Sequence, residues 1–141
     1  MNYKEYKAPS FMEAYKNAFK SFFDFDGRSR RAEYWKFFGM YYMFAIIIFA
    51  ISGILSYISD TFLAIGLVIL GIYYIVHLLP SISILVRRLH DSGHTAKWLF
   101  GTLIPYLGIL FCIPIIIFIF QDSEEEFNNW GESTKYYTDN D

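Results

Sequence analysis

The sequence of 141 residues contains only one cysteine, Cys112. A single thiol can form neither a disulfide within the chain nor a metal cluster held by several cysteines. Cys112 lies inside an apolar run, where a free thiol behaves as a small buried side chain. We therefore expect neither a disulfide framework nor a cysteine-ligated metal.

Charged side chains are absent from three long stretches, 37–59, 62–86 and 98–120. Hydrophobic residues make up 55% of the chain and aromatic residues 21%, which is more apolar surface than a soluble core of this length can bury. At about 1.5 Å per residue, each stretch can cross a hydrocarbon core of about 30 Å as a helix. We predict an all-α membrane protein with three transmembrane helices over these ranges.

Prolines within the spans and the lengths of the connections between them add detail to this prediction. Pro80 interrupts the second span and Pro105 and Pro114 the third, so kinks are expected. Residues 59–61 leave room only for a tight antiparallel turn, whereas the 11 residues of 87–97 have room for chemistry. We expect no removable signal peptide, because the 36 residues before the first apolar run lack a short hydrophobic core with a cleavage site.

Lys and Arg side chains indicate the orientation, because positively charged loops tend to stay in the cytoplasm. Eight of them flank one side of the spans, and the other side has Lys135 alone. The eight are Lys20, Arg28, Arg30, Arg31, Lys36, Arg87, Arg88 and Lys97. We predict a cytoplasmic N-terminus and a cytoplasmic 87–97 loop, with the 59–61 turn and the acidic tail outside. Pro105 and Pro114 leave open a re-entrant third segment that would return the tail to the cytoplasm.

An amphipathic helix is predicted ahead of the first span. Apolar residues recur there at helical spacing, and Ser10 with Glu13 makes a capping box. The helix either lies along the membrane surface or packs on the protein's own cytoplasmic loops. The chain then divides into a cytoplasmic amphipathic segment (1–24), a multi-span membrane domain (25–131) and a flexible polar tail (132–141).

Two polar motifs flank the first two spans. One reads F-x-G-R-x-x-R-x-E-Y-W from Phe25 to Trp35, and the other reads R-R-L-H-D-x-G from Arg87 to Gly93. Together they resemble the family known as domain of unknown function 805, over about Phe25 to Gly131. The resemblance implies a small, multi-pass bacterial inner-membrane protein of unassigned biochemistry, with no established catalytic residues to carry over.

The charged residues of these motifs have two interpretations. Arg28, Arg31, Arg87 and Arg88 are candidates for binding an anionic lipid or another anion. Alternatively, the same arginines pair with the acidic residues of the two motifs in a structural network. Further candidates for a structural or functional role are Glu33, Trp35, His90 and Asp91.

Histidines suggest two other sites. His90, Asp91 and His94 form an H-D-x-x-H string whose histidines would share one face of a helix, as metal ligands do, although Gly93 disfavours a helix there. His77 lies inside the second span, where an ionisable group is a functional candidate by default. The alternative for His77 is a neutral ring bonded to a backbone carbonyl that Pro80 frees. We assign no catalytic residue, no metal and no cofactor.

The leading hypothesis is a non-enzymatic inner-membrane protein whose basic cytoplasmic face binds anionic membrane lipids or a protein partner. One alternative is an enzyme acting on a lipid or a lipid-linked phosphate through the His90, Asp91 and His94 loop. Another is a transport or channel component, which three spans would build only as a homo-oligomer or with a membrane-protein partner. No motif accompanies the basic residues that would indicate nucleic-acid binding.

Overall fold

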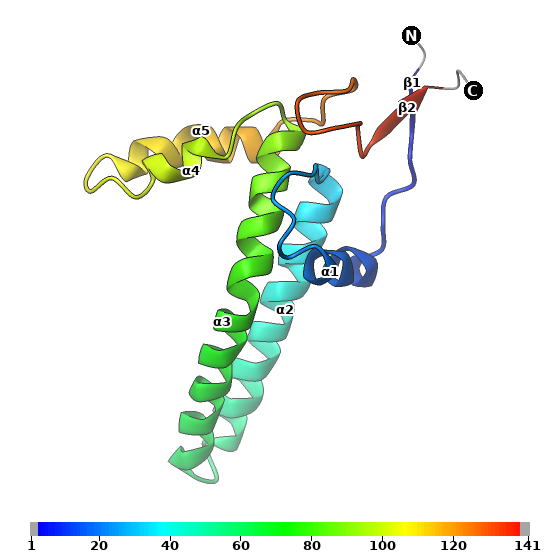
Figure 1. The fold of residues 1–141 in the computed structure, drawn as a ribbon. Coiled ribbons are helices and arrows are strands. Elements are labelled where there is room, and N and C mark those ends of the chain that lie inside the picture. The colour runs from blue at the N-terminus through cyan, green and yellow to red at the C-terminus, as the bar shows by residue number, and fades with distance from the viewer. Residues whose placement is uncertain (1–2, 139–141) are drawn as a thin grey trace.

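The main feature of the fold is a hairpin of two long helices. The computed structural model describes residues 3–138, and within them α2 (Arg31–Leu55) and α3 (Asp60–Asp91) run antiparallel beside each other (Figure 1). Ser59 caps α3, since its hydroxyl accepts a hydrogen bond from the Thr61 N–H. Both helices are long and apolar enough to cross a membrane, and they contain most of the first two predicted spans. Pro80 is buried within α3, which continues through it.

A close approach at Gly66 brings the two helices of the hairpin together. A Cβ atom at Gly66 would lie 1.8 Å from the Ser52 Oγ and 2.2 Å from its Cβ. Ser52 is buried and donates to the Ile48 carbonyl at 2.7 Å, which satisfies its hydroxyl within α2. Only glycine therefore fits at position 66 without moving the helices apart.

The predicted third span is not one helix. Residues 98–120 form α4 (Lys97–Gly101) and α5 (Gly108–Phe120), separated at Pro105, and the intervening Tyr106 has a φ of 64°. The 13 residues of α5 extend only about 20 Å, which is short of a hydrocarbon core of about 30 Å. Figure 1 shows α4 and α5 lying together across one end of the hairpin. The structure thus adopts a broken third segment instead of a continuous span.

Helix α1 (Phe11–Lys20) lies across the hairpin on the other side (Figure 1). The predicted capping box is confirmed: the Glu13 N–H donates to the Ser10 hydroxyl at 3.2 Å, and the Ser10 N–H donates to the Glu13 carboxylate at 2.6 Å. Ala14 and Ala18 are buried in the packing of α1 on α2 and α3, whereas Phe11 is exposed. Helix α1 therefore packs on the protein through one side and keeps apolar residues exposed elsewhere on its surface.

Both ends of the described chain meet at one end of the hairpin. Strand β1 (Tyr3–Glu5) pairs antiparallel with β2 (Tyr136–Thr138), with Glu5 opposite Tyr136. The tail that we expected to be flexible thus contains a paired strand as far as Thr138. Of the two positions that the sequence left open for the tail, the structure has the one beside the N-terminal strand, because the broken third segment brings the chain back to β1.

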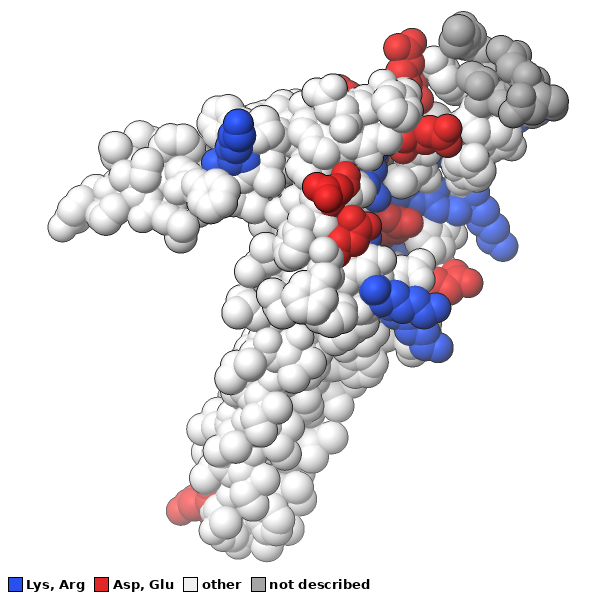
Figure 2. All heavy atoms as spheres, in the orientation of Figure 1, with Lys and Arg blue, Asp and Glu red and all other residues white. Residues whose placement is uncertain are grey.

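Charged residues are distributed unevenly between the two ends of the hairpin. In Figure 2, Lys, Arg, Asp and Glu gather around the end that carries α1 and the strands, and the long shaft of the hairpin is uncharged down to its tip. Asp60 is the charged residue of the turn. A small core joins α1, α2, α3 and α5 near the charged end; it consists of Ala18, Tyr34, Phe37, Ile84, Leu89, Ile115 and Ile119.

Replacing Gly66 with Ala should destabilise the hairpin by about 1–3 kcal/mol, because the added methyl group overlaps Ser52. Thermal unfolding of the purified protein in detergent would measure the change. Gly71→Ala is the matched control, since a Cβ there meets nothing within 4 Å. In a Ser52→Gly background the extra cost of Gly66→Ala should disappear. Equal effects of Gly66→Ala and Gly71→Ala would contradict this packing.

Candidate functional site

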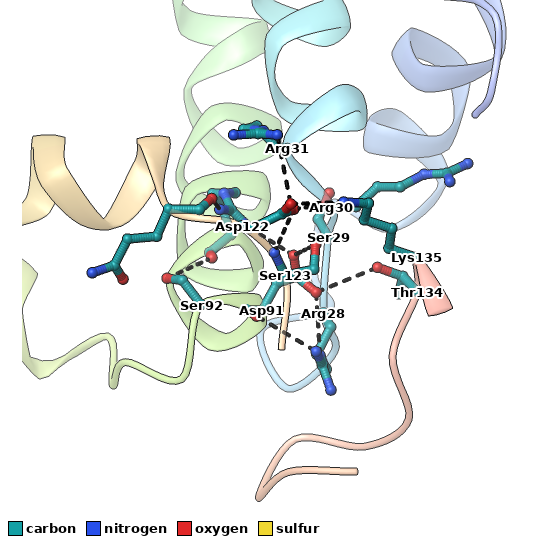
Figure 3. A network of polar contacts seen from close by, with 12 residues as sticks. Arg28, Ser29, Arg30, Arg31, Asp91, Ser92, Asp122, Ser123, Thr134 and Lys135 are labelled. Atoms are coloured by element: carbon teal, nitrogen blue, oxygen red, sulfur yellow. Dashed lines mark hydrogen bonds and ion pairs between the residues drawn. The ribbon is translucent and has the colours of Figure 1, made fainter. Parts of the chain in front are cut away.

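Asp91 lies at the centre of a buried polar network at the last residue of α3. Its side chain is fully buried between two guanidinium groups. Oδ1 pairs with the Arg28 Nε at 3.2 Å, and Oδ2 pairs with the Arg88 Nη1 at 2.6 Å. Oδ2 also accepts a hydrogen bond of 2.6 Å from the Ser123 hydroxyl (Figure 3). The carboxylate therefore joins residues from three distant parts of the chain.

Arg88 fixes the end of α5 against the end of α3. Its Nε donates to the Ile119 carbonyl at 3.2 Å, and its Nη2 donates to the carbonyls of Phe118 and Gln121. These groups belong to the last turn of α5, whose carbonyls have no partner within the helix and carry its negative partial charge. Burial lowers the pKa of Arg88, and the adjacent Asp91 carboxylate opposes that shift.

Arg28 holds the segment after α5 in place by donating hydrogen bonds to its carbonyls. Its Nη2 donates to the Glu124 carbonyl at 2.7 Å, and its Nη1 donates to the carbonyls of Glu126 at 2.9 Å and Gly131 at 3.1 Å. Ser29 adds a backbone bond, since its N–H donates to the Arg87 carbonyl at 3.0 Å. The first motif is thereby fastened both to α3 and to the 124–131 loop.

The other two arginines predicted to bind anions differ in exposure. Arg87 is buried, and its Nε has no hydrogen-bond partner in the described part of the chain. Burial lowers the pKa of Arg87, although the nearby acidic groups of Asp24 and Glu33 counteract this. Arg31 is different, because its side chain is 46% exposed; it donates to the Phe120 carbonyl and lies 3.8 Å from Asp122. Of the four, Arg31 offers the most accessible charge.

The H-D-x-x-H string does not converge on one point. His90 stacks on Trp130 with ring centres 4.3 Å apart, while His94 stacks on Phe118 at 3.5 Å. Asp91 faces the two arginines instead. Between residues 3 and 138 there is no group of three or more His, Cys, Asp or Glu side chains arranged to hold a metal.

The remaining network candidates of the first motif also have partners. Glu33 accepts a hydrogen bond of 2.9 Å from the Ser29 hydroxyl, near the start of α2. Trp35 packs on Phe120 at the end of α5, with ring centres 5.0 Å apart. The Trp35 contact joins α2 to α5, whereas the Glu33 hydrogen bond is local to the start of α2.

His77 connects α3 to α1. Its Nδ1 donates to the Tyr73 carbonyl at 2.7 Å, so its Nε2 accepts the 2.6 Å hydrogen bond from the Tyr15 hydroxyl. Pro80 has no N–H to donate to the carbonyl four residues earlier in the helix, so the carbonyl that it frees is that of Val76. The carbonyl that His77 binds is therefore not the one that the proline frees.

Comparison with known proteins identifies the family. The model of the family described as "Protein of unknown function (DUF805)" matches residues 22–132. This chain belongs to that DUF805 family. The Escherichia coli (strain K12) inner membrane protein YhaH is 35% identical over 125 residues, covering 88% of this chain and 98% of that protein. Inner membrane protein YhaI of the same strain is 28% identical over 126 residues, covering 89% and 98%. No solved structure matches the chain significantly.

Both of these relatives are inner membrane proteins, and two helices of this chain are long and apolar enough to cross a membrane; together these findings support an integral membrane protein, as the sequence predicted. The matched residues include Arg28, Asp91 and Ser123 of the buried network. Helix α1 and the two strands lie outside the match.

A groove beside this network was missed by sequence reasoning. It has a volume of about 880 Å³ and is lined by residues from the end of α3, from α4 and from the loop between them. Its wall is mostly apolar, and polar or amphipathic side chains gather from Asp26, His90, Thr95, Lys97 and Trp130. In the sequence, only the length of the 87–97 loop indicated space for a site. The groove itself could not be predicted, because its lining comes from three separate segments of the chain.

Replacing Asp91 with Asn should destabilise the protein by about 3–5 kcal/mol, because it leaves two buried guanidinium groups without their counter-charge. The decrease in apparent melting temperature in detergent would measure this loss of stability. Asp122→Asn is the matched control: its carboxylate is 47% exposed beside Arg31 and Lys135, so we expect a loss below about 1 kcal/mol. Similar losses for both variants would contradict a central role for Asp91.

Proposed function

We propose that α2 and α3 are the membrane-crossing helices and that α4 and α5 lie at the cytoplasmic surface of the inner membrane. The short α5 and its exposed apolar side chains support an embedded segment that does not cross. The excess of Lys and Arg at the end opposite the turn supports a cytoplasmic N-terminus. Because β2 pairs with β1, the tail is then cytoplasmic as well.

The position of α1 is consistent with this orientation. Tyr15 of α1 contacts His77, which is 17 residues beyond Asp60 and hence about 26 Å from the turn. That length approaches the thickness of a hydrocarbon core, about 30 Å. Helix α1 would then lie at the interface, with its exposed Lys16 and Lys20 able to reach the lipid headgroups.

At this surface the protein acts as a phospholipid-binding protein without catalytic activity, and the groove between α3 and α4 is its binding site. The observation that carries this proposal is the groove itself. Ile82, Leu85, Phe100 and Leu103 form an apolar wall for acyl chains, and polar residues are available for a headgroup. Its position at the proposed membrane surface gives a lipid direct access from the bilayer.

The groove is a better site than the arginines on which the sequence hypothesis depended. The N–H groups of Arg28 and Arg88 already donate to carbonyls and to Asp91, so a lipid phosphate would have to displace those partners. Arg31 retains an exposed surface and supports a peripheral contact with anionic headgroups. The enzyme alternative uses the loop of His90, Asp91 and His94. The pairing of Asp91 with two arginines and the separate stacking partners of the histidines do not favour it.

The proposed topology predicts which side of the membrane the tail occupies. In a Cys112→Ser background, a cysteine replacing Glu125 should react with a membrane-impermeant thiol reagent in inverted membrane vesicles but not in intact spheroplasts. Asp60→Cys in the same background is the reference and should show the opposite pattern, because it lies at the turn. Labelling of both positions from the same side would require a third crossing.

Blocking the groove tests the proposed binding. Ala96→Trp places a large side chain in the groove wall, so the purified protein should lose most of the phospholipid that the unmodified protein retains. Native mass spectrometry after gentle detergent extraction would count the bound lipids. Ala64→Trp is the matched control, since Ala64 is exposed near the far end of the hairpin. Equal lipid retention in the two variants, both folded, would contradict the groove as the site.

A further inference from the structure

The polar residues of the groove carry both signs of charge. Lys97 contributes an ammonium group and Asp26 a carboxylate, and both residues are exposed. Neither side chain has a hydrogen bond or an ion pair within the described residues. These formal charges cancel, so the groove offers separate places for a cation and an anion instead of a basic surface.

His90 adds a hydrogen-bond acceptor to the same wall. The residue is 5% exposed, and its Nδ1 lies 3.3 Å from the Gly27 carbonyl. A carbonyl can only accept, so the proton resides on Nδ1 and Nε2 keeps a free lone pair. No hydrogen bond to Nε2 occurs among the described residues. Burial lowers the pKa of His90, and the Gly27 carbonyl and the carboxylates of Asp26 and Asp24 oppose that shift.

Thr95 lies beside Lys97 and can contribute a donor. Its hydroxyl oxygen accepts a 2.9 Å hydrogen bond from the Lys97 backbone N–H, which leaves the hydroxyl hydrogen available. Lys97 and Thr95 thus supply donors for a phosphate, whereas Asp26 and His90 supply acceptors for an ammonium group. The indole of Trp130, stacked on His90, adds an aromatic face to the groove, which also favours a cation.

We propose that the groove selects phosphatidylethanolamine, with the lipid phosphate at Lys97 and Thr95 and the ammonium group at Asp26 and His90. This selectivity rests on the proposed phospholipid binding and names the headgroup for that site. Phosphatidylglycerol has a phosphate but no ammonium group, so Asp26 would repel it without compensation. Phosphatidylcholine carries a quaternary ammonium, which has no N–H to donate to Asp26 or His90.

Competition between lipids tests the selectivity. The full chain in detergent would receive equal amounts of the three phospholipids with identical acyl chains, and native mass spectrometry would measure which of them binds. We expect phosphatidylethanolamine to predominate over both others. Asp26→Asn should reduce its preference over phosphatidylglycerol by about two- to fivefold, as expected for loss of an exposed charge contact. Asp26→Lys should reverse the preference.

Asp60→Asn is the control for this measurement, because it removes the same charge at the turn and should leave the preference unchanged. Absence of any bound lipid on the unmodified protein would overturn the proposed function itself. Lipid binding that Ala96→Trp abolishes, but without preference for phosphatidylethanolamine or without response to Asp26→Asn, would overturn only the headgroup assignment. The melting temperature of each variant confirms that it is folded.

Discussion

The arrangement of this protein depends on one buried carboxylate between two buried guanidinium groups. Burying ions is costly unless each one is paired and its remaining hydrogen bonds are satisfied. Asp91 balances one of the two positive charges, and the other is distributed over main-chain carbonyls that follow and end α5. The hydrogen bonds of the Arg88 guanidinium group are therefore complete only when α5 ends beside α3. This requirement links the buried charges to the path of the chain.

That requirement accounts for the fate of the third apolar stretch. A straight helix over 98–120 would place its end at the opposite side of the bilayer, far from Arg88. The break at Pro105 lets α4 and α5 fold back, so the Phe118 and Ile119 carbonyls reach the guanidinium. The chain then leaves α5 at the same end as the N-terminus, where the two terminal strands can pair.

The groove is a consequence of the same network. Arg88 and Asp91 turn inward at the end of α3, and His90 between them faces outward to the groove. Arg28 holds the Glu126 and Gly131 carbonyls, which positions Trp130 to stack on His90. The network thus builds one wall of the groove without entering it. This separation leaves Asp26 and Lys97 exposed in the groove, outside the buried charge network.

The sequence by itself determined the local and compositional features. The hairpin follows from two long uncharged stretches and a three-residue turn, the α1 cap follows from Ser10 and Glu13, and the two motifs indicated the family. Only the tertiary structure decided the direction of the third stretch, the side of the tail, the burial of Arg28 and Arg88, and the groove. Hydropathy and charge counting treat each residue by itself, whereas Arg88 is buried by carbonyls about 30 positions away, and such distant partners are set by the fold as a whole.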